Sequence, residues 1–189
     1  MRKRMCGVSL VELLLVLTIL ALLVASLDSQ GFARSRDEKQ ADGVMSDIVS
    51  AISMARQAAI LENVMVTYCR SDDGMHCQGN WQDGSIIFTD RNADRRINGD
   101  DRLLHRLDAA AITGSLRFKS FRNRQYLQMT PFGFTNYQNG NFTWCPANRD
   151  NTLARQVIVS MTARTRYARD SDGDGIIEDS QGKPLTCDL

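Results

Sequence analysis

The stretch CGVSLVELLLVLTILALLVAS (Cys6–Ser26) decides where this chain is placed and how its first helix is used. Residues 8–27 contain a single ionisable group, Glu12. A helix of about 20 residues rises about 30 Å, which matches the hydrocarbon core of a bilayer. The run therefore predicts a transmembrane helix. The basic residues at 2–4 predict a cytoplasmic N-terminus, with the rest of the chain on the far side.

Three kinds of N-terminal signal compete to explain this apolar run. An ordinary secretory signal would be cut at the small residues VAS (24–26), but a charge inside its apolar region only impairs insertion. A lipoprotein signal needs its cysteine after the apolar run, whereas Cys6 precedes it. A leader cut between Gly7 and Val8 leaves the apolar helix on the mature protein, and only this alternative gives Glu12 a purpose.

Cleavage after Gly7 would supply Glu12 with a partner. The new amine at Val8 lies four residues before Glu12, which is one helical turn along the same face. A charged side chain without a partner at the centre of a bilayer costs at least about 2.5 kcal/mol. The ammonium group of the same chain or of a neighbouring copy would neutralise it, and such a pair would fix the register of subunits in a helical assembly.

The same residues carry a family resemblance. The residues that match the family pattern in order are Gly7, Val8, Ser9, Leu10, Val11, Glu12 and Leu13. They resemble the N-terminal signal of type IV pilins and type II secretion pseudopilins, although Val8 stands where Phe is common and Ser26–Ser29 lacks the frequent proline. The resemblance implies a prepilin peptidase that cuts after Gly7 and methylates the amine of Val8. It also implies other pilins, the inner membrane and an assembly platform as partners.

The helix is expected to continue beyond the membrane, over 28–62. Apolar residues recur there at spacings of three and four, which indicates an amphipathic helix that packs one side on the rest of the chain. They are Val44, Met45, Ile48, Val49, Ile52, Ala55, Ala59 and Ile60. Gly31 and Gly43 each weaken the helix by about 1 kcal/mol relative to alanine.

Short segments rich in β-branched and aromatic residues follow, separated by Gly, Asn and Asp, and they predict strands. The segments are 64–69, 85–89, 115–121, 125–129, 141–145 and 155–160. We therefore predict an α+β protein with a leader (1–7), a long N-terminal helix (8–62) and a β-rich head (63–189). The resemblance implies the type IV pilin fold, in which the helix packs on a small antiparallel sheet.

The first half of the head resembles one subgroup of that superfamily. The subgroup pattern has two cysteines around a polar loop, then W-x-x-G, hydrophobic residues ending in Phe, and an Asp. The matching residues are Cys69, Cys77, Trp81, Gly84, Ile86, Ile87, Phe88 and Asp90. On these residues the chain resembles the GspH/FimT group of pseudopilins and minor pilins.

The chain has five cysteines, an odd number that is awkward for an exported protein. Cleavage after Gly7 removes Cys6 and leaves four, which allow three pairings. We favour Cys69–Cys77, because this pair closes a short local loop. The pair Cys145–Cys187 then remains to hold the C-terminal tail. A zinc site is a poor alternative, since the chain has no CxxC pair and only two histidines.

The acidic stretch DSDGDGIIEDSQ (170–181) resembles the start of an EF-hand calcium loop. The acids at its first, third and fifth places are Asp170, Asp172 and Asp174. Gln181 replaces the bidentate glutamate of the twelfth place, so that Glu178 or Asp179 would have to substitute for it. Calcium is thus the one cofactor that the sequence suggests, and a polar turn without an ion is the alternative.

A second acidic stretch, DRNADRRINGDD (90–101), has a similar frame. Asp90, Asn92 and Asp94 stand at its first, third and fifth places. Arg95, however, occupies the sixth place, where the sharp turn of a calcium loop requires glycine. A plain turn is therefore the preferred interpretation here.

The formal net charge of +1 argues against a chain that is basic throughout. Within 102–169, however, eleven Lys or Arg stand against two acids, a net charge of +9. Arg164 and Arg166 resemble the arginines of a Gly-Arg-x-Arg motif of DNA-uptake minor pilins, although Ala163 replaces the glycine. If the segment is a strand, both guanidinium groups project to one side and suit a phosphate backbone. The alternative is that they pair with acids of 170–181.

No arrangement of Ser, His, Cys and Asp suggests catalysis, so we do not expect an enzyme. The resemblance implies a structural subunit that initiates or tips a type IV pilus or a type II secretion pseudopilus. The alternative function is that of a minor pilin that binds DNA for uptake. In either case the expected location is the bacterial inner membrane, spanned once, with the head in the periplasm.

Overall fold

The computed structural model describes residues 9–25, 29–108 and 114–188. The chain divides into two compact parts, Met1–Arg36 and Asp37–Leu189, which we describe separately. The first part contains helix α1 (Leu10–Ala25) and the start of helix α2 (Ser29–Glu62). The second part contains the rest of α2 and all of the strands.

Helix α1 begins with a side-chain cap. The Ser9 hydroxyl accepts a hydrogen bond from the backbone N–H of Glu12 at 3.2 Å, and the Ser9 carbonyl accepts one from Leu13 at 3.1 Å. Ser9 and Glu12 thus stand at the two positions of a capping box, S-x-x-E, in which the serine satisfies a free N–H of the first turn. Ser9 therefore defines where α1 begins.

Helix α2 is unbroken through Gly31 and Gly43 and buries one side in the head. The buried residues of this side are Ala41, Val44, Met45, Ile48, Ala51, Ile52, Ala55 and Ala59. The apolar periodicity therefore identified most of the stripe. It was wrong for Ile60, whose side chain is 47% exposed near the end of the helix.

The first sheet has four antiparallel strands in the order β3-β2-β1-β5. Their bounds are β1 Val66–Arg70, β2 Gly84–Thr89, β3 Leu103–Asp108 and β5 Tyr126–Met129. In the central pair Tyr68 lies opposite Ile87, and both side chains face α2 within the main core. Strand β3 was not predicted from the sequence.

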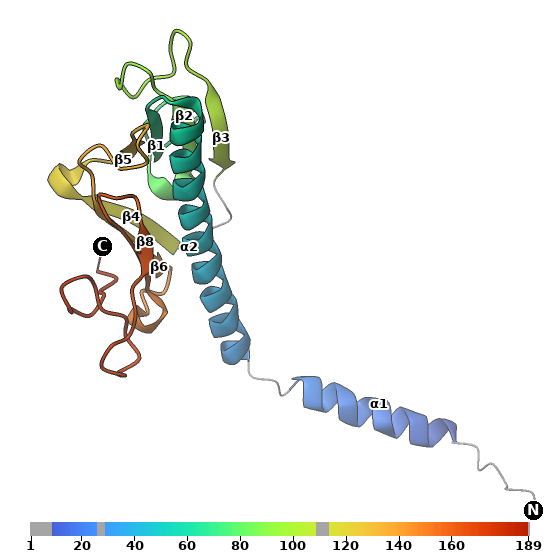
Figure 1. The fold of residues 1–189 in the computed structure, drawn as a ribbon. Coiled ribbons are helices and arrows are strands. Elements are labelled where there is room, and N and C mark those ends of the chain that lie inside the picture. The colour runs from blue at the N-terminus through green and yellow to red at the C-terminus, as the bar shows by residue number, and fades with distance from the viewer. Residues whose placement is uncertain (1–8, 26–28, 109–113, 189) are drawn as a thin grey trace, which may run out of the picture. The chain divides into compact units, whose positions relative to one another are not determined.

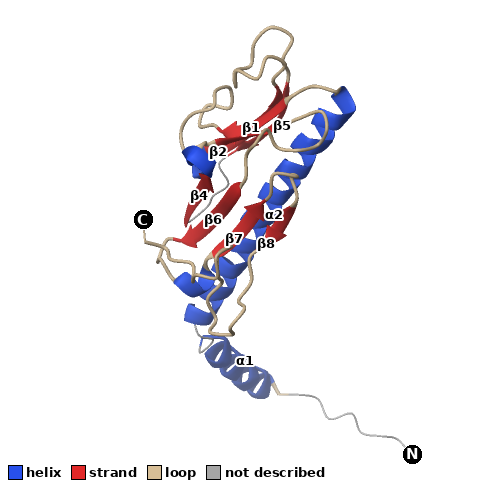
Figure 2. Cartoon of the chain, turned by 60° about the vertical axis from the view of Figure 1, so that its left-hand side comes forward, coloured by secondary structure: helices blue, strands red, loops and turns tan. Residues whose placement is uncertain are grey.

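The second sheet is also antiparallel, in the order β4-β6-β7-β8. Its strands are β4 Gly114–Ser120, β6 Gly140–Pro146, β7 Arg155–Val159 and β8 Thr165–Tyr167. The first sheet lies beside the C-terminal half of α2 and the second lies further toward its N-terminal half (Figure 1 and Figure 2). The fold is thus α+β as predicted, with the strands in two sheets instead of one.

Trp81 joins the two sheets. It lies in a short 3-10 helix (Trp81–Asp83) between β1 and β2, is 5% exposed, and belongs to the same core as α2. Its ring is 5.1 Å from that of Tyr68 in the first sheet, and 5.6 Å and 4.9 Å from those of Phe118 and Phe142 in the second. Aromatic pairs at such distances add to the apolar area that they bury. The Trp of the W-x-x-G pattern is therefore a packing residue.

Strand β2 is buried on both faces, because loops cover the face that points away from α2. Ile86 and Phe88 on that face pack with Cys69, and Cys77 and Ile97 of the flanking loops lie against them. A strand whose successive side chains point to opposite faces needs such a second cover if both sets are apolar. This explains the continuous hydrophobic run of the family pattern.

Candidate functional site

Helix α1 exposes an apolar surface on all sides. Every described side chain of Leu10–Val24 is exposed, among them Leu10 at 76% and Leu22 at 71%. The charged residue in this helix is Glu12, in the first turn. Gly7 and Val8, between which we expect cleavage, lie outside the described residues. An apolar surface of this extent requires lipid or other protein around it.

Two helical segments are apolar enough to be compared with a membrane span. Arg34–Glu62 is long and apolar enough by composition, but 39% of its most apolar window is buried in the head, and Asp47 and Arg56 interrupt it. Leu10–Val24 is apolar but shorter. Because the apolar side of α2 already packs on the sheets, we assign its buried residues, from Ala41 to Ala59, to the core of the head. The apolar surface that α1 exposes is the better candidate for lipid.

Two disulfides close the head. Cys69 and Cys77 are joined, with an S–S distance of 2.02 Å, and Cys145 and Cys187 are joined at 2.10 Å. These are the two pairs that we favoured from the sequence, because Cys69–Cys77 closes a short local loop and leaves Cys145 and Cys187 for each other. Cys145 lies in β6, one residue before its end, so the second bridge fixes the C-terminal tail on the second sheet, where Leu185 packs in the same small cluster.

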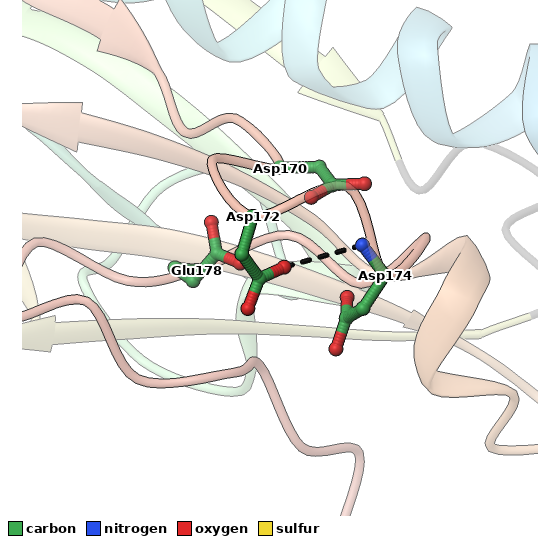
Figure 3. A group of neighbouring side chains, drawn as sticks. All are labelled: Asp170, Asp172, Asp174 and Glu178. Carbon is green, nitrogen blue, oxygen red and sulfur yellow. Dashed lines mark hydrogen bonds between the residues drawn. The ribbon is translucent and has the colours of Figure 1, made fainter.

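The acids of the 170–181 loop come together in space (Figure 3). Asp170, Asp172, Asp174 and Glu178 each place one carboxylate oxygen within 4.8 Å of the others. The three aspartates are exposed, whereas Glu178 is buried. Of the described residues, this is the one group of three or more acids, histidines or cysteines with the spacing of a metal site.

The 170–181 loop orients its aspartates through its own backbone. Asp170 accepts hydrogen bonds from the N–H groups of Gly173 (2.6 Å) and Gly175 (2.9 Å), and Asp174 accepts one from Ile176 (2.7 Å). Gly175, at the sixth place of the loop, has φ +88°, a conformation that strongly favours glycine. The chain therefore makes the sharp turn that an EF-hand-like loop requires.

The 90–101 loop is built differently, because its acids accept hydrogen bonds from protein donors, although the Oδ1 atom of Asp90 is buried without a hydrogen-bond partner among the described residues. Asp90 is fully buried and accepts hydrogen bonds from Thr67, Gln128 and the backbone of Arg95 on one oxygen. Asp94 accepts them from the Asn98 amide and others, and the Asn98 bond is the main reason why the pKa of Asp94 is lowered. This loop is a turn that is held by hydrogen bonds within itself and to β1 and β5, which agrees with the preferred interpretation.

Arg164 and Arg166 lie at the edge of the second sheet. Arg164 closes the turn between β7 and β8, where the N–H of Ser160 donates to its carbonyl at 3.0 Å, and Arg166 lies in β8 opposite Ile158. Both side chains are exposed. Across the part of the chain that the structure describes, neither guanidinium group forms an ion pair, so the alternative of pairing with the 170–181 acids is not observed.

Ala163 occupies the position where the resembling motif has glycine. Its φ is +56°, in the left-handed region, and its methyl group is buried at 5% exposure. A turn of this shape, with a left-handed residue before the returning strand, favours glycine. The motif glycine is therefore explained by backbone conformation, and alanine here carries some strain in exchange for a buried methyl.

Sequence reasoning missed Arg56, which lines one pocket with Arg164. This pocket lies between α2 and the β7–β8 turn, and Ser53 and Thr165 also line it. The Nε atom of Arg56 is buried and has no hydrogen-bond partner among the described residues. The signal was available: an arginine next to the small apolar residues of the helical stripe stands at the border of the core.

Two family models match the chain, one over most of the head and one at the N-terminus. The family model described as "Type II transport protein GspH" matches residues 45–163, which is more than half of the chain. The model described as "Prokaryotic N-terminal methylation motif" matches residues 2–27. The second match covers the expected cleavage site and helix α1.

Two crystal forms of the type IV minor pilin FimU of Pseudomonas aeruginosa (strain PAO1) have a similar fold. One has a TM-score of 0.55 at 18% identity and covers 79% of this chain and 96% of FimU. The other has a TM-score of 0.50 at 16% identity and covers 78% and 99%. Identities this low establish the fold, which is the type IV pilin fold, and nothing about residues. No curated protein matches the chain.

Proposed function

Because the chain belongs to the GspH family of type II transport proteins, we propose that it acts where a filament starts or at its tip. The filament is a type IV pilus or a type II secretion pseudopilus. The family and the fold are those of structural pilin-type subunits, which assemble with other pilins and are anchored in a membrane. Our proposal adds a position to this general role, namely that of a minor subunit at the start or the tip of the filament.

The observation that carries the proposal is the apolar surface of α1. Its apolar side chains are exposed, and its first turn holds Glu12. In the membrane the surface is covered by lipid, and in a filament it is covered by the same helix of other subunits. Cleavage between Gly7 and Val8 by a prepilin peptidase would then provide the ammonium group that Glu12 of this or a neighbouring subunit requires.

Complementation of a deletion strain tests this role. The wild-type gene is expected to restore filaments or secretion, and Glu12→Ala is expected to restore neither, because the ammonium group at Val8 loses the carboxylate that pairs with it. Thr18→Val is the matched control on α1, since the Thr18 hydroxyl already donates to the Leu15 carbonyl at 2.8 Å and needs no other subunit. Immunogold labelling should find the head at filament ends. Labelling along the whole filament would refute the tip role.

Mass spectrometry of the membrane-extracted protein tests the processing step. The expected chain begins at Val8 and is heavier by one methyl group than the unmodified cleaved chain. A chain that retains residues 1–7, or one that begins after Ser26, would overturn the processing proposal.

The second candidate function is DNA capture, which the free guanidinium groups of Arg164 and Arg166 favour. Arg56 supports this candidate, because it lines the same pocket as Arg164 and its buried Nε has no hydrogen-bond partner in the described part of the chain. Such donors suit phosphate oxygens in a sequence-independent way. Binding of this kind is weak and depends steeply on salt.

Electrophoretic mobility shift with the full chain in detergent tests DNA capture. Arg164→Glu/Arg166→Glu should abolish retention at low salt, and Arg164→Ala/Arg166→Ala should reduce the salt slope by about 2 if both contact phosphate. Arg117→Glu/Lys119→Glu is the control, because it makes the same charge change on exposed positions of β4. Equal loss in the control would mean that the whole basic segment acts by its charge, and that the two arginines are not a site.

A further inference from the structure

We propose that the 170–181 loop binds one calcium ion through Asp170, Asp172, Asp174 and Glu178. Calcium binds oxygen ligands at about 2.3–2.6 Å, so two ligands on opposite sides of the ion are about 4.6–5.2 Å apart. The four carboxylates have oxygens within 4.8 Å of one another. One ion placed among them can therefore reach all four with little movement of the chain.

The buried carboxylate of Glu178 is independent evidence for a cation. Glu178 is 7% exposed, and its Oε2 atom accepts a hydrogen bond from the N–H of Ser171 at 2.7 Å. Its Oε1 atom is buried and has no hydrogen-bond partner among the described residues. A buried oxygen of a charged group is costly to leave without a partner. Because Glu178 belongs to the cluster drawn in Figure 3, a cation bound there would satisfy it.

The charge of the cluster points the same way. Four carboxylates within 4.8 Å repel one another, and the hydrogen bonds that the aspartates accept from backbone N–H groups leave their net charge unchanged. Within the described ranges, the ion pairs of the protein involve other acids, so no Lys or Arg neutralises the group. A divalent cation would remove the repulsion.

The ligand set favours calcium over other ions. All of the side-chain donors are carboxylate oxygens, whereas zinc sites in proteins draw mainly on nitrogen and sulfur. Magnesium requires near-ideal octahedral geometry and gives up its waters reluctantly, which suits a cage of four protein carboxylates poorly. Glu178, at the ninth place of the loop, supplies the carboxylate that Gln181 at the twelfth place lacks.

The ion would stabilise the C-terminal part of the head. The N–H of Glu178 donates to the Arg169 carbonyl at 3.3 Å, and Glu178 is bridged to Pro184 in an antiparallel pair. Leu185 and Cys187 of the tail follow and pack on the second sheet. An ion that joins the start of the loop to Glu178 therefore links the tail to the end of β8 and acts beside the Cys145–Cys187 bridge.

Calorimetry on the full chain in detergent, with disulfides intact and metals removed by EGTA, tests the proposal. Calcium chloride should bind with a Kd below about 1 mM, the range of extracellular calcium modules and tighter, and magnesium chloride at least about 10-fold more weakly. Saturating calcium should raise the midpoint of thermal unfolding by several degrees. No heat and no shift up to about 10 mM calcium would overturn the proposal.

Variants locate the site. Asp172→Asn/Asp174→Asn and, separately, Glu178→Gln should each weaken calcium binding at least about 10-fold, because each removes ligand charge. Glu178→Gln keeps an oxygen for the Ser171 N–H, so it preserves the fold. Asp94→Asn/Asp101→Asn makes the same charge change as the double variant in the other acidic loop, and its affinity should stay within about 2-fold of the wild type. Equal loss in this control, or unchanged binding in both site variants, would overturn the assignment.

A stability measurement adds a result that a purely structural loop would not give. In EGTA, Asp172→Asn/Asp174→Asn should unfold at the same temperature as the wild type or higher, because the variant relieves repulsion. In saturating calcium the order should reverse, because the wild type alone gains the ion. An order that is the same in both solutions would contradict the proposal.

Discussion

Tyr68 shows how burial in this head changes the chemistry of one side chain. The residue lies in β1 at 2% exposure, with Trp81 and Phe142 beside its ring. Burial, aided by the charge of Asp47, raises the pKa of Tyr68 to about 12, and a hydrogen bond with Ser85 opposes the shift in part. The phenol is thus held neutral because water is excluded from it.

This shift predicts a loss of stability in alkali. The unfolded chain releases the Tyr68 proton near pH 10 and the folded chain near pH 12, so the stabilisation is complete below pH 10 and is lost as pH rises to 12. Between pH 9 and 11 the free energy of unfolding should fall by about 1.3 kcal/mol more in the wild type than in Tyr68→Phe. Urea unfolding at both pH values measures this difference. An equal fall in the free energy of unfolding for both proteins would show that the phenol is not shielded.

At the residue scale, the sequence predicted best those residues whose type alone restricts their role. Cysteines pair only with cysteines, and Glu12 in an apolar run demands an explanation from its charge. The capping role of Ser9 was readable from S-x-x-E but was hidden by the stronger apolar signal around it. The place of Arg56 at the border of the helical stripe was readable, but its pocket with Arg164 was not, because the β7–β8 turn lies far from it in the sequence.

At the scale of the element, α2 is the support on which both sheets are laid. Its buried stripe reaches from Ala41 to Ala59 and shares one core with strands of the two sheets. The stripe consists largely of alanine and medium-sized apolar residues, which allow the sheets to approach the helix closely. If a large side chain of this stripe is replaced by a smaller one, a cavity remains. Neither sheet can move to fill it, because both pack in the same core.

Two methionines of α2 provide a matched test. Met45 is fully buried, whereas Met54 is 40% exposed. Met45→Ala should lower the free energy of unfolding by about 2–5 kcal/mol, and Met54→Ala by less than about 1 kcal/mol. Chemical denaturation of both variants measures this, and similar losses would mean that α2 is not packed as described.

The strands that were missed, β3 and β8, are edge strands of their two sheets. The side chains of β3 are exposed or half-buried on both faces, so they show no alternation of apolar and polar residues. Strand β8 has three residues, too few for any period. An edge strand is held mainly by backbone hydrogen bonds to one neighbour, which every sequence can form, and side-chain patterns therefore carry little information about it.

At the scale of the whole molecule, the two disulfides differ in the length of chain that they constrain. Cys145–Cys187 spans 42 residues and contains the 170–181 loop, whereas Cys69–Cys77 spans 8 residues. On chain entropy alone, these bridges stabilise the head by about 4 and about 2.5 kcal/mol. The longer bridge is therefore expected to dominate.

Paired alanine substitutions test this order. Cys145→Ala/Cys187→Ala should lower the free energy of unfolding more than Cys69→Ala/Cys77→Ala, by about 1.5 kcal/mol. Alanine avoids placing a hydroxyl in the buried positions. If the shorter bridge proves the more important one, the stabilisation comes from covering the first sheet and not from restraining the unfolded tail.

The tail bridge also makes the maturation of this protein depend on its surroundings. Thiols stay reduced in most cytosols, and disulfides persist only where the environment is oxidising. A newly made chain would thus wait with its last segment unfastened until the head reached an oxidising compartment. A cell that failed to form the Cys145–Cys187 bridge would hold subunits whose C-terminal segment is not fastened and is open to proteases. The oxidising capacity of the compartment would then set how many subunits can be assembled into a filament.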